Sequence, residues 1–195
     1  LYWIFKLGLT NNHISCPTVC PVENISIYDA VKTLPFDDAE LLFRRAPLPM
    51  QYTGETDHPM HSCWLSLFDE SAESMLYLVT ETVATGRRHH ITEKTFKPIA
   101  LGMPFVLVAT QGSLKYLRSY GFRTFGDIWD ESYDDEPNDV VRMERIASLL
   151  RSLDELPQSA KQDMFHWCQE VVEHNSNINI PLWSSGKWHL QHHKN

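Results

Sequence analysis

The stretch that decides the fold is Ile91–Val108, which reads ITEKTFKPIALGMPFVLV. Its apolar residues recur at the i, i+3, i+4, i+7 spacing of one helix face: Phe96, Ile99, Ala100 and Met103. Gly102 and Pro104 are typical of a helix end, and residues 105–109 form a continuous apolar run. Such a run suits a strand covered on both faces, as in a parallel sheet. The stretch therefore predicts a helix followed by a buried strand.

Pro98 bears on where this helix begins. With Thr92 as the N-cap, Pro98 stands at the sixth helical position, where a proline costs about 3 kcal/mol. With Thr95 as the N-cap, Pro98 falls in the first turn, where its missing N–H is not needed. We therefore favour Thr95, which leaves Glu93 and Lys94 in the preceding loop. A kinked helix that starts after Thr92 stays open as the alternative.

The elements on either side extend the pattern. Residues 75–81 read MLYLVTE and predict a second buried strand that ends in Glu81. After the strand over 105–109, Ser113 is expected to cap a short helix, and residues 122–125 predict a third short strand. Strands that alternate with helices imply right-handed crossovers and a parallel α/β sheet with flanking helices.

The chain is expected to have three parts: an irregular, proline-rich N-terminal segment (1–65), an α/β domain (66–180) and a tail (181–195). Two amphipathic helices, over about 138–153 and about 159–174, are expected to close the α/β domain.

Two elements are expected within the N-terminal segment. Residues 1–5 read as a buried strand, and Asp37 is expected to cap a helix over 38–44. The rest of this segment is expected to form long loops.

Composition excludes several classes of protein. With 43% hydrophobic residues among 195, the chain can bury a sizeable core, and most of it is not disordered. A net charge of −8 and the lack of any basic run of five or more residues argue against nucleic-acid binding. No apolar run approaches the length of a membrane span. The four cysteines are too sparse for a disulfide framework, so we expect a reduced, cytoplasmic protein.

Charged residues cluster between the two buried strands. A carboxylate such as Glu93 accepts hydrogen bonds from sugar hydroxyls, whereas Lys94 and a helix N-terminus suit a diphosphate. Ligands of parallel sheets bind at the carboxyl ends of the strands, which is where Glu81 and the loop with Arg87 and Arg88 are expected. An ordinary helix start beside a solvated lysine explains the spacing of Glu93 and Lys94 as well.

Other kinds of site have weaker support. The sequence has no Gly-x-Gly-x-x-Gly, no phosphate-binding P-loop and no Gly-x-Ser-x-Gly elbow, and Cys168 stands on an apolar helix face. The acidic loop over 127–136 reads as solvated. Histidines and cysteines occur in three groups, none at a recognised metal spacing, so we expect no metal: His13, Cys16 and Cys20; His58, His61 and Cys63; His89 and His90.

Three segments together resemble a known family: residues 75–82 (MLYLVTET), 91–94 (ITEK) and 100–107 (ALGMPFVL). Their order and spacing are similar to the donor-binding signature of α1,3-fucosyltransferase-like glycosyltransferases. In that family an apolar strand ends in glutamate, and a loop leads to Thr-Glu-Lys, a helix and a second strand. Thr82 and His90 depart from the family pattern, which leaves the sugar and the base open.

The resemblance implies a Rossmann-like domain, one half of a GT-B architecture, that binds a nucleoside-diphosphate sugar. Thr92, Glu93 and Lys94 would form its Thr-Glu-Lys tripeptide, with Glu93 on the ribose and Lys94 on the phosphates. Arg87 or Arg88 would assist. Transfer to a glycan or another hydroxyl acceptor would need no metal.

Only one half of that architecture is visible in the sequence. The chain is therefore expected to hold the donor-binding part, with residues 1–65 as the remnant of an acceptor domain. Glu81, Glu55 and Asp57 are unranked candidates for the catalytic base. A non-catalytic nucleotide- or carbohydrate-binding or assembly module with the same fold is the alternative.

Overall fold

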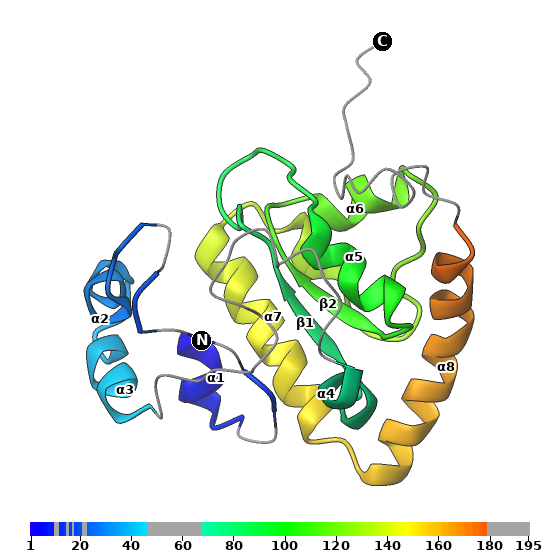
Figure 1. The fold of residues 1–195 in the computed structure, drawn as a ribbon, viewed down its shortest axis with the longest axis horizontal. Helices are drawn as coiled ribbons and strands as arrows, with labels where there is room; N and C mark the ends of the chain where they lie inside the picture. The colour runs from blue at the N-terminus through cyan, green and yellow to red at the C-terminus, as the bar shows by residue number, and fades with distance from the viewer. Residues whose placement is uncertain (10–11, 15, 17, 21–22, 47–67, 179–195) are drawn as a thin grey trace. The chain divides into compact units, whose positions relative to one another are not determined.

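Two short parallel strands, β1 (Tyr77–Thr80) and β2 (Phe105–Val108), lie between helices in the computed structural model of the protein (Figure 1). The structure describes residues 1–9, 12–14, 16, 18–20, 23–46 and 68–178. The chain divides into two compact units, Leu1–Ser62 and Cys63–Asn195. The fold is mixed α/β and mostly helical, with a two-stranded parallel sheet flanked by helices.

Both buried strands predicted from the sequence are confirmed, each a little shorter than predicted. Tyr77 pairs with Phe105 and Thr80 with Val108, in parallel register. Val79 and Val106 are almost completely buried, as expected of strands covered on both faces.

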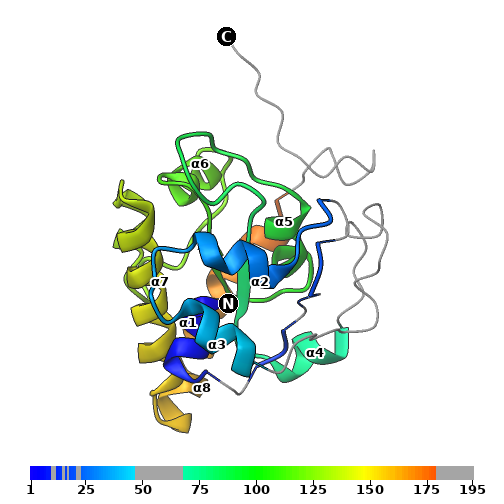
Figure 2. The same cartoon turned by 90° about the vertical axis from the view of Figure 1, so that its left-hand side faces the viewer.

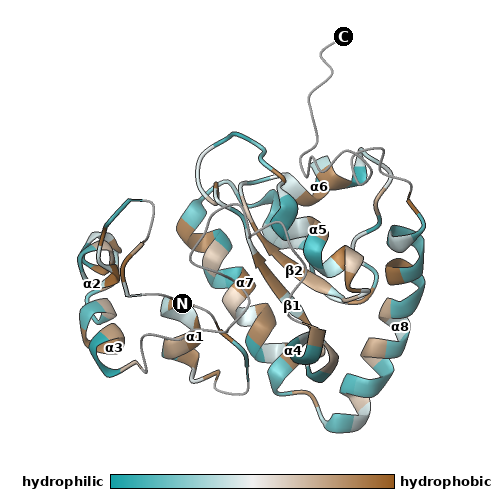
Figure 3. Ribbon diagram, in the orientation of Figure 1, coloured by the Kyte–Doolittle hydropathy of each residue, from teal (hydrophilic) through white to brown (hydrophobic). Residues whose placement is uncertain are grey.

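Helices cover both faces of this sheet. Helix α5 (Glu93–Ala100) connects the two strands and packs on β1, whereas α7 (Asp139–Asp154) packs on β2 from the opposite side (Figure 2). Helix α8 (Gln158–Ser176) packs against α5. Apolar residues concentrate on the strands and on the inward helix faces (Figure 3). This arrangement leaves the carboxyl ends of β1 and β2 at one edge, beside the start of α5.

The predicted start of α5 at Thr95 is wrong. Thr92 is the N-cap, its hydroxyl accepts a hydrogen bond from the Lys94 N–H at 3.4 Å, and Pro98 lies inside the helix. Glu93 and Lys94 therefore belong to the first helical turn, and not to the loop before it.

The predicted third strand over 122–125 is also wrong, because side chains occupy its backbone groups. The side-chain amide of Asn175 accepts from the Arg123 N–H at 2.8 Å and donates to the Arg123 carbonyl at 3.0 Å. The Glu131 carboxylate accepts from the Phe125 N–H at 2.8 Å. With those groups engaged, the segment cannot join the sheet ladder.

Both long helices of the prediction are confirmed. Asn138 caps α7 through hydrogen bonds from the N–H groups of Val140 and Val141. Cys168 of α8 is fully buried, and burial raises the pKa of its thiol to about 12, so it stays protonated and unreactive.

The described part of this unit also contains shorter helical elements: α4 (Phe68–Glu73), α6 (Ser113–Arg118) and the 3-10 helix η3 (Ser132–Asp135). Ser113 is the first residue of α6 and not its predicted cap. Gly112 holds the cap position with φ of 77°, a backbone conformation that favours glycine.

Within Leu1–Ser62 the structure forms small helices: α1 (Tyr2–Leu7), α2 (Ile27–Ala30), the 3-10 helix η1 (Val31–Thr33) and α3 (Ala39–Arg45). The predicted strand over 1–5 is wrong, since α1 occupies it; short apolar runs do not distinguish the two. Tyr2 stacks on Phe36 with ring centroids 4.0 Å apart. Asp38, and not Asp37, is the N-cap of α3, and it forms an ion pair with Lys6.

Candidate functional site

The carboxyl edge of the parallel sheet is the candidate site. β1 ends at Thr80 and is followed by Glu81, whereas β2 ends at Val108 and is followed by the turn into α6. Ligands of parallel α/β sheets bind at this edge, where strand ends and helix starts meet. The loop over 82–91 joins the end of β1 to the start of α5 and carries the predicted cations.

Glu81 is buried at this edge and holds α5 in place. Its carboxylate accepts three hydrogen bonds: from the Thr92 N–H at 2.9 Å, the Thr92 hydroxyl at 2.6 Å and the Thr95 hydroxyl at 2.6 Å. Only 5% of the residue is exposed. These bonds stabilise a helix start at Thr92 and offset the cost of Pro98 inside the helix, which is why the proline rule failed here.

This geometry gives Glu81 a structural role. A carboxylate that already accepts three buried hydrogen bonds is poorly placed to accept a proton from a sugar hydroxyl. The remaining candidates for a catalytic base, Glu55 and Asp57, lie outside the described residues.

Glu93 and Lys94 form an ion pair at the exposed end of the same helix. Their side-chain atoms Oε1 and Nζ are 2.7 Å apart, with 14% of Glu93 and 37% of Lys94 exposed. Burial pushes the pKa of Glu93 upward, but the hydrogen bond and the charge of Lys94 outweigh it and hold that pKa below its ordinary value. Glu93 is therefore an ionised acceptor near neutral pH.

Replacing Lys94 with methionine is expected to raise the pKa of Glu93, because burial then acts without an opposing charge. In the native chain the lowered pKa contributes stability that is present above the unfolded-state value and lost as pH falls through the folded-state value. A carboxyl-carbon NMR titration of Glu93 measures the change. Lys115→Met, an exposed lysine on α6, is the control and should leave this pKa unchanged; an unshifted Glu93 in Lys94→Met contradicts the assignment.

The loop with Arg87 and Arg88 is fixed through its backbone and one histidine. The Thr110 hydroxyl donates to the Arg88 carbonyl at 3.1 Å, and His89 Nε2 lies 2.8 Å from the Gln111 carbonyl oxygen. The His89 ring also stacks on Tyr116, with centroids 5.1 Å apart. Both arginines are exposed. Within the described part of the chain, neither guanidinium forms a hydrogen bond or an ion pair, so both are available to an anion.

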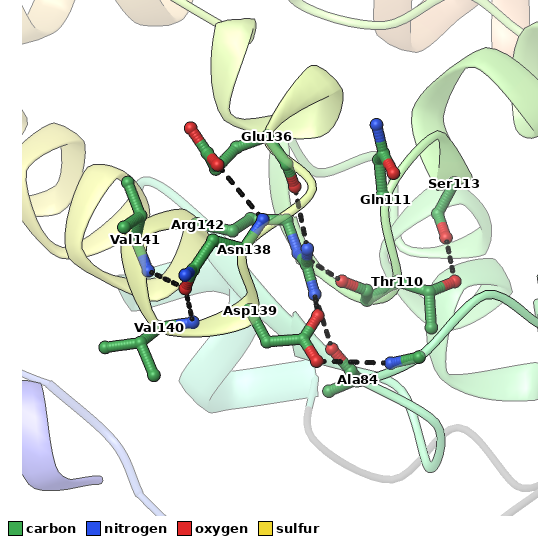
Figure 4. A network of polar contacts seen from close by, with 12 residues as sticks. Ala84, Thr110, Gln111, Ser113, Glu136, Asn138, Asp139, Val140, Val141 and Arg142 are labelled. Atoms are coloured by element: carbon green, nitrogen blue, oxygen red, sulfur yellow. Dashed lines mark hydrogen bonds and ion pairs between the residues drawn. The ribbon is translucent and has the colours of Figure 1, made fainter. Parts of the chain in front are cut away.

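Arg142 holds this loop against the sheet, and it was not among the site residues predicted from the sequence. Its guanidinium donates to three carbonyl oxygens, those of Ala109 at 3.1 Å, Glu136 at 2.8 Å and Ala84 at 2.9 Å, and pairs with Asp139 (Figure 4). The Asp139 carboxylate in turn accepts from the Gly86 N–H at 3.3 Å.

One sequence signal could have revealed Arg142. It lies on the apolar face of α7, in helical register with Ile146, Leu149 and Leu153, where a charged residue needs internal partners. Those partners are far away in sequence, so the pattern alone did not identify them.

The start of α6 at the same edge already has an acceptor. The buried carboxylate of Asp134 accepts from the Leu114 N–H at 3.0 Å and the Lys115 N–H at 3.1 Å. A nearby carboxylate, Glu131, bonds to the Thr124 hydroxyl at 2.6 Å, and burial raises its pKa. Asp130 accepts from both the N–H and the hydroxyl of Ser132. Asp134 and Glu131 are therefore engaged within the chain, whereas Asp127, Asp130 and Asp135 are exposed, as expected of a solvated loop.

The two helix starts therefore offer fewer free N–H groups than the sequence suggested. Thr92 N–H and Lys94 N–H in α5, like Leu114 N–H and Lys115 N–H in α6, donate to side chains of the chain itself. Anion binding at this edge would depend on Arg87, Arg88 and Lys94 rather than on helix N-termini.

Metal binding has no geometric support where the chain is described. Among those residues, no group of three or more His, Cys, Asp or Glu side chains is arranged to hold an ion. His58, His61 and Cys63 lie outside the described residues.

Comparisons with known proteins do not assign this edge. No protein-family model matches the chain, and no curated protein or solved structure is significantly similar to it. In the described ranges, no helix is long and apolar enough to span a membrane.

Proposed function

We propose that this chain binds a nucleoside-diphosphate sugar at the carboxyl edge of its sheet, as the donor-binding part of a glycosyltransferase-like protein. The observation that carries the proposal is the segment that runs from the end of β1 into the first turn of α5. It combines two exposed arginines, which have no partner among the described residues, with the Glu93–Lys94 pair, at the edge where parallel α/β sheets bind ligands. On this proposal the α/β unit is one Rossmann-like half of a GT-B architecture.

The chemistry of a sugar nucleotide fits these groups. An ionised Glu93 can accept hydrogen bonds from the two vicinal hydroxyls of a ribose. Lys94, Arg87 and Arg88 can bind the diphosphate and stabilise the charge that develops on it when the sugar leaves. Cations in this role make a metal ion unnecessary for transfer to a hydroxyl acceptor.

One observation favours the alternative, a non-catalytic binding or assembly module. Glu81, the strand-end carboxylate, is occupied by Thr92 and Thr95, so it is a poor general base. Release of nucleoside diphosphate from a sugar nucleotide, measured with simple sugar acceptors, separates an enzyme from such a module.

Thermal unfolding with nucleotides tests the binding proposal. We expect at least one of GDP, UDP, ADP and CMP to raise the melting temperature by several degrees at saturation, because a ligand that binds only the folded state stabilises it. The double variant Glu93→Ala/Lys94→Ala should lose most of that shift. Arg151→Ala/Glu155→Ala removes an exposed ion pair at the C-terminal end of α7, with atoms 2.8 Å apart; it is the matched control and should keep the shift.

Two results would contradict the proposal. One is that none of the four nucleotides stabilises the native chain. The other is a shift that survives the Glu93→Ala/Lys94→Ala change, which would move the nucleotide away from this edge.

A further inference from the structure

A groove of about 700 Å³ lies between α7 and α8, and residues of the 128–133 segment also line it. The two helices meet at a short turn and diverge from it (Figure 1). Side chains of α7 line the groove at helical spacing: Val141, Arg145, Leu149 and Leu153. Since each helical residue advances about 1.5 Å, this side of the groove extends for about 18 Å. An elongated groove of that length matches a helix of three to four turns better than a compact small molecule.

The groove is largely apolar, and part of its lining faces solvent. Leu156, Met164 and Trp167 contribute to it, and Trp167 is 62% exposed. Tryptophan loses little conformational entropy when it is buried and is frequent at the energetic centre of interfaces. The floor includes Trp129, which is 6% exposed and whose indole N–H has no acceptor among the described residues.

The charges around the groove are mainly negative. Glu144 and Asp163 line it and are exposed, and neither is paired with a cation in the part of the chain that the structure describes. The charge of Arg145, which also lines the groove, is balanced by Glu136 at 2.7 Å. Asp130 adds a third carboxylate to the lining. A partner with lysine or arginine beside its apolar residues would complement this surface.

We propose that the groove between α7 and α8 docks a basic amphipathic helix of a partner protein. Apolar residues of that helix pack against Leu149, Leu153 and Trp167, as in other complexes in which a helix binds in a groove. Its basic residues face Glu144 and Asp163. This site is separate from the proposed sugar-nucleotide site and does not depend on it.

A synthetic peptide tests the proposal directly. The probe is a fluorescently labelled 15-residue helix with leucine on one face and lysine on the other, titrated onto the full chain and followed by anisotropy. A peptide of the same composition in scrambled order lacks the apolar face. We expect saturable binding of the amphipathic peptide in the micromolar range, and binding at least tenfold weaker for the scrambled peptide.

Variants of the groove lining test where the amphipathic peptide binds. Trp167→Ala and Glu144→Lys/Asp163→Lys should each weaken the amphipathic peptide at least tenfold, because they remove the exposed aromatic or reverse the rim charge. Asp69→Lys/Glu173→Lys makes the same change in net charge at exposed positions outside the groove and should change affinity less than twofold. Circular dichroism confirms that each variant is folded.

Three results overturn the proposal. The first is the absence of saturable binding. The second is equal weakening by the groove and control charge variants, which indicates general attraction to an acidic protein. The third is a dimer in sedimentation that Trp167→Ala converts to a monomer, which shows that a second copy of this chain covers the groove.

Discussion

Replacing Arg142 with alanine is expected to lower the free energy of unfolding by about 3–4 kcal/mol. The guanidinium is 1% exposed and donates to the carbonyls of Ala109, Glu136 and Ala84. Its removal leaves these acceptors without their donor and opens a space inside the α7–sheet contact. Each buried polar group left unpaired costs about 1–3 kcal/mol. Urea unfolding followed by circular dichroism measures the change.

Two other variants serve as comparisons for the stability of Arg142→Ala. Arg145→Ala removes an exposed arginine from the same helix, together with its ion pair to Glu136, and should cost less than about 1 kcal/mol. Arg142→Lys keeps the charge but loses the planar guanidinium group. Its loss of unfolding free energy should therefore lie between those of Arg142→Ala and Arg145→Ala. Equal stability of Arg142→Ala and Arg145→Ala would contradict the role given to Arg142.

Replacing Glu81 with alanine is expected to cost about 2–4 kcal/mol. The change leaves the Thr92 N–H and the hydroxyls of Thr92 and Thr95 without their shared acceptor. It also removes the interaction that offsets Pro98, so the first turn of α5 should fray. Hydrogen exchange at the Thr95 and Phe96 amides should accelerate more than exchange in α8.

Two matched controls distinguish the loss of the three hydrogen bonds of Glu81 from the loss of a negative charge. Glu155→Ala removes an exposed carboxylate at the C-cap of α7 and should change stability by less than about 1 kcal/mol. Glu81→Gln retains one carbonyl oxygen and should cost less than Glu81→Ala. If Glu81→Ala is as stable as Glu155→Ala, the three hydrogen bonds do not hold the helix start.

Glu81 and Pro98 show where prediction from sequence succeeds and where it stops. Continuous apolarity predicted both strands, and helical periodicity predicted α7, because these signals are local. The start of α5 depends on a carboxylate 11 residues upstream of its cap, and a rule for an isolated proline does not include that contact. The failed strand over 122–125 has the same cause, since Asn175 lies 52 residues from its partner Arg123.

The candidate site, too, has features that the sequence predicts and features that it does not. The sequence alone brings Glu93 beside Lys94 and places Arg87 and Arg88 a few residues earlier. It does not reveal that Arg142 holds the loop, because the contacts of Arg142 with Ala109 and Ala84 span 33 and 58 residues. Nor does it show that Glu81 and Asp134 occupy the helix starts at this edge. These contacts shift the expected anion binding from the helix N-termini to the basic side chains.

NMR mapping of a nucleotide on the 15N-labelled chain tests most directly whether a sugar nucleotide binds at the carboxyl edge of the sheet. With GDP, and with UDP if GDP does not bind, we expect saturable shifts at residues 86–95 and at the turn 110–113. Amides that line the groove between α7 and α8 should stay unchanged. Shifts confined to other parts of the chain, or no shifts with either nucleotide at millimolar concentration, would contradict a sugar-nucleotide site at the carboxyl edge of the sheet.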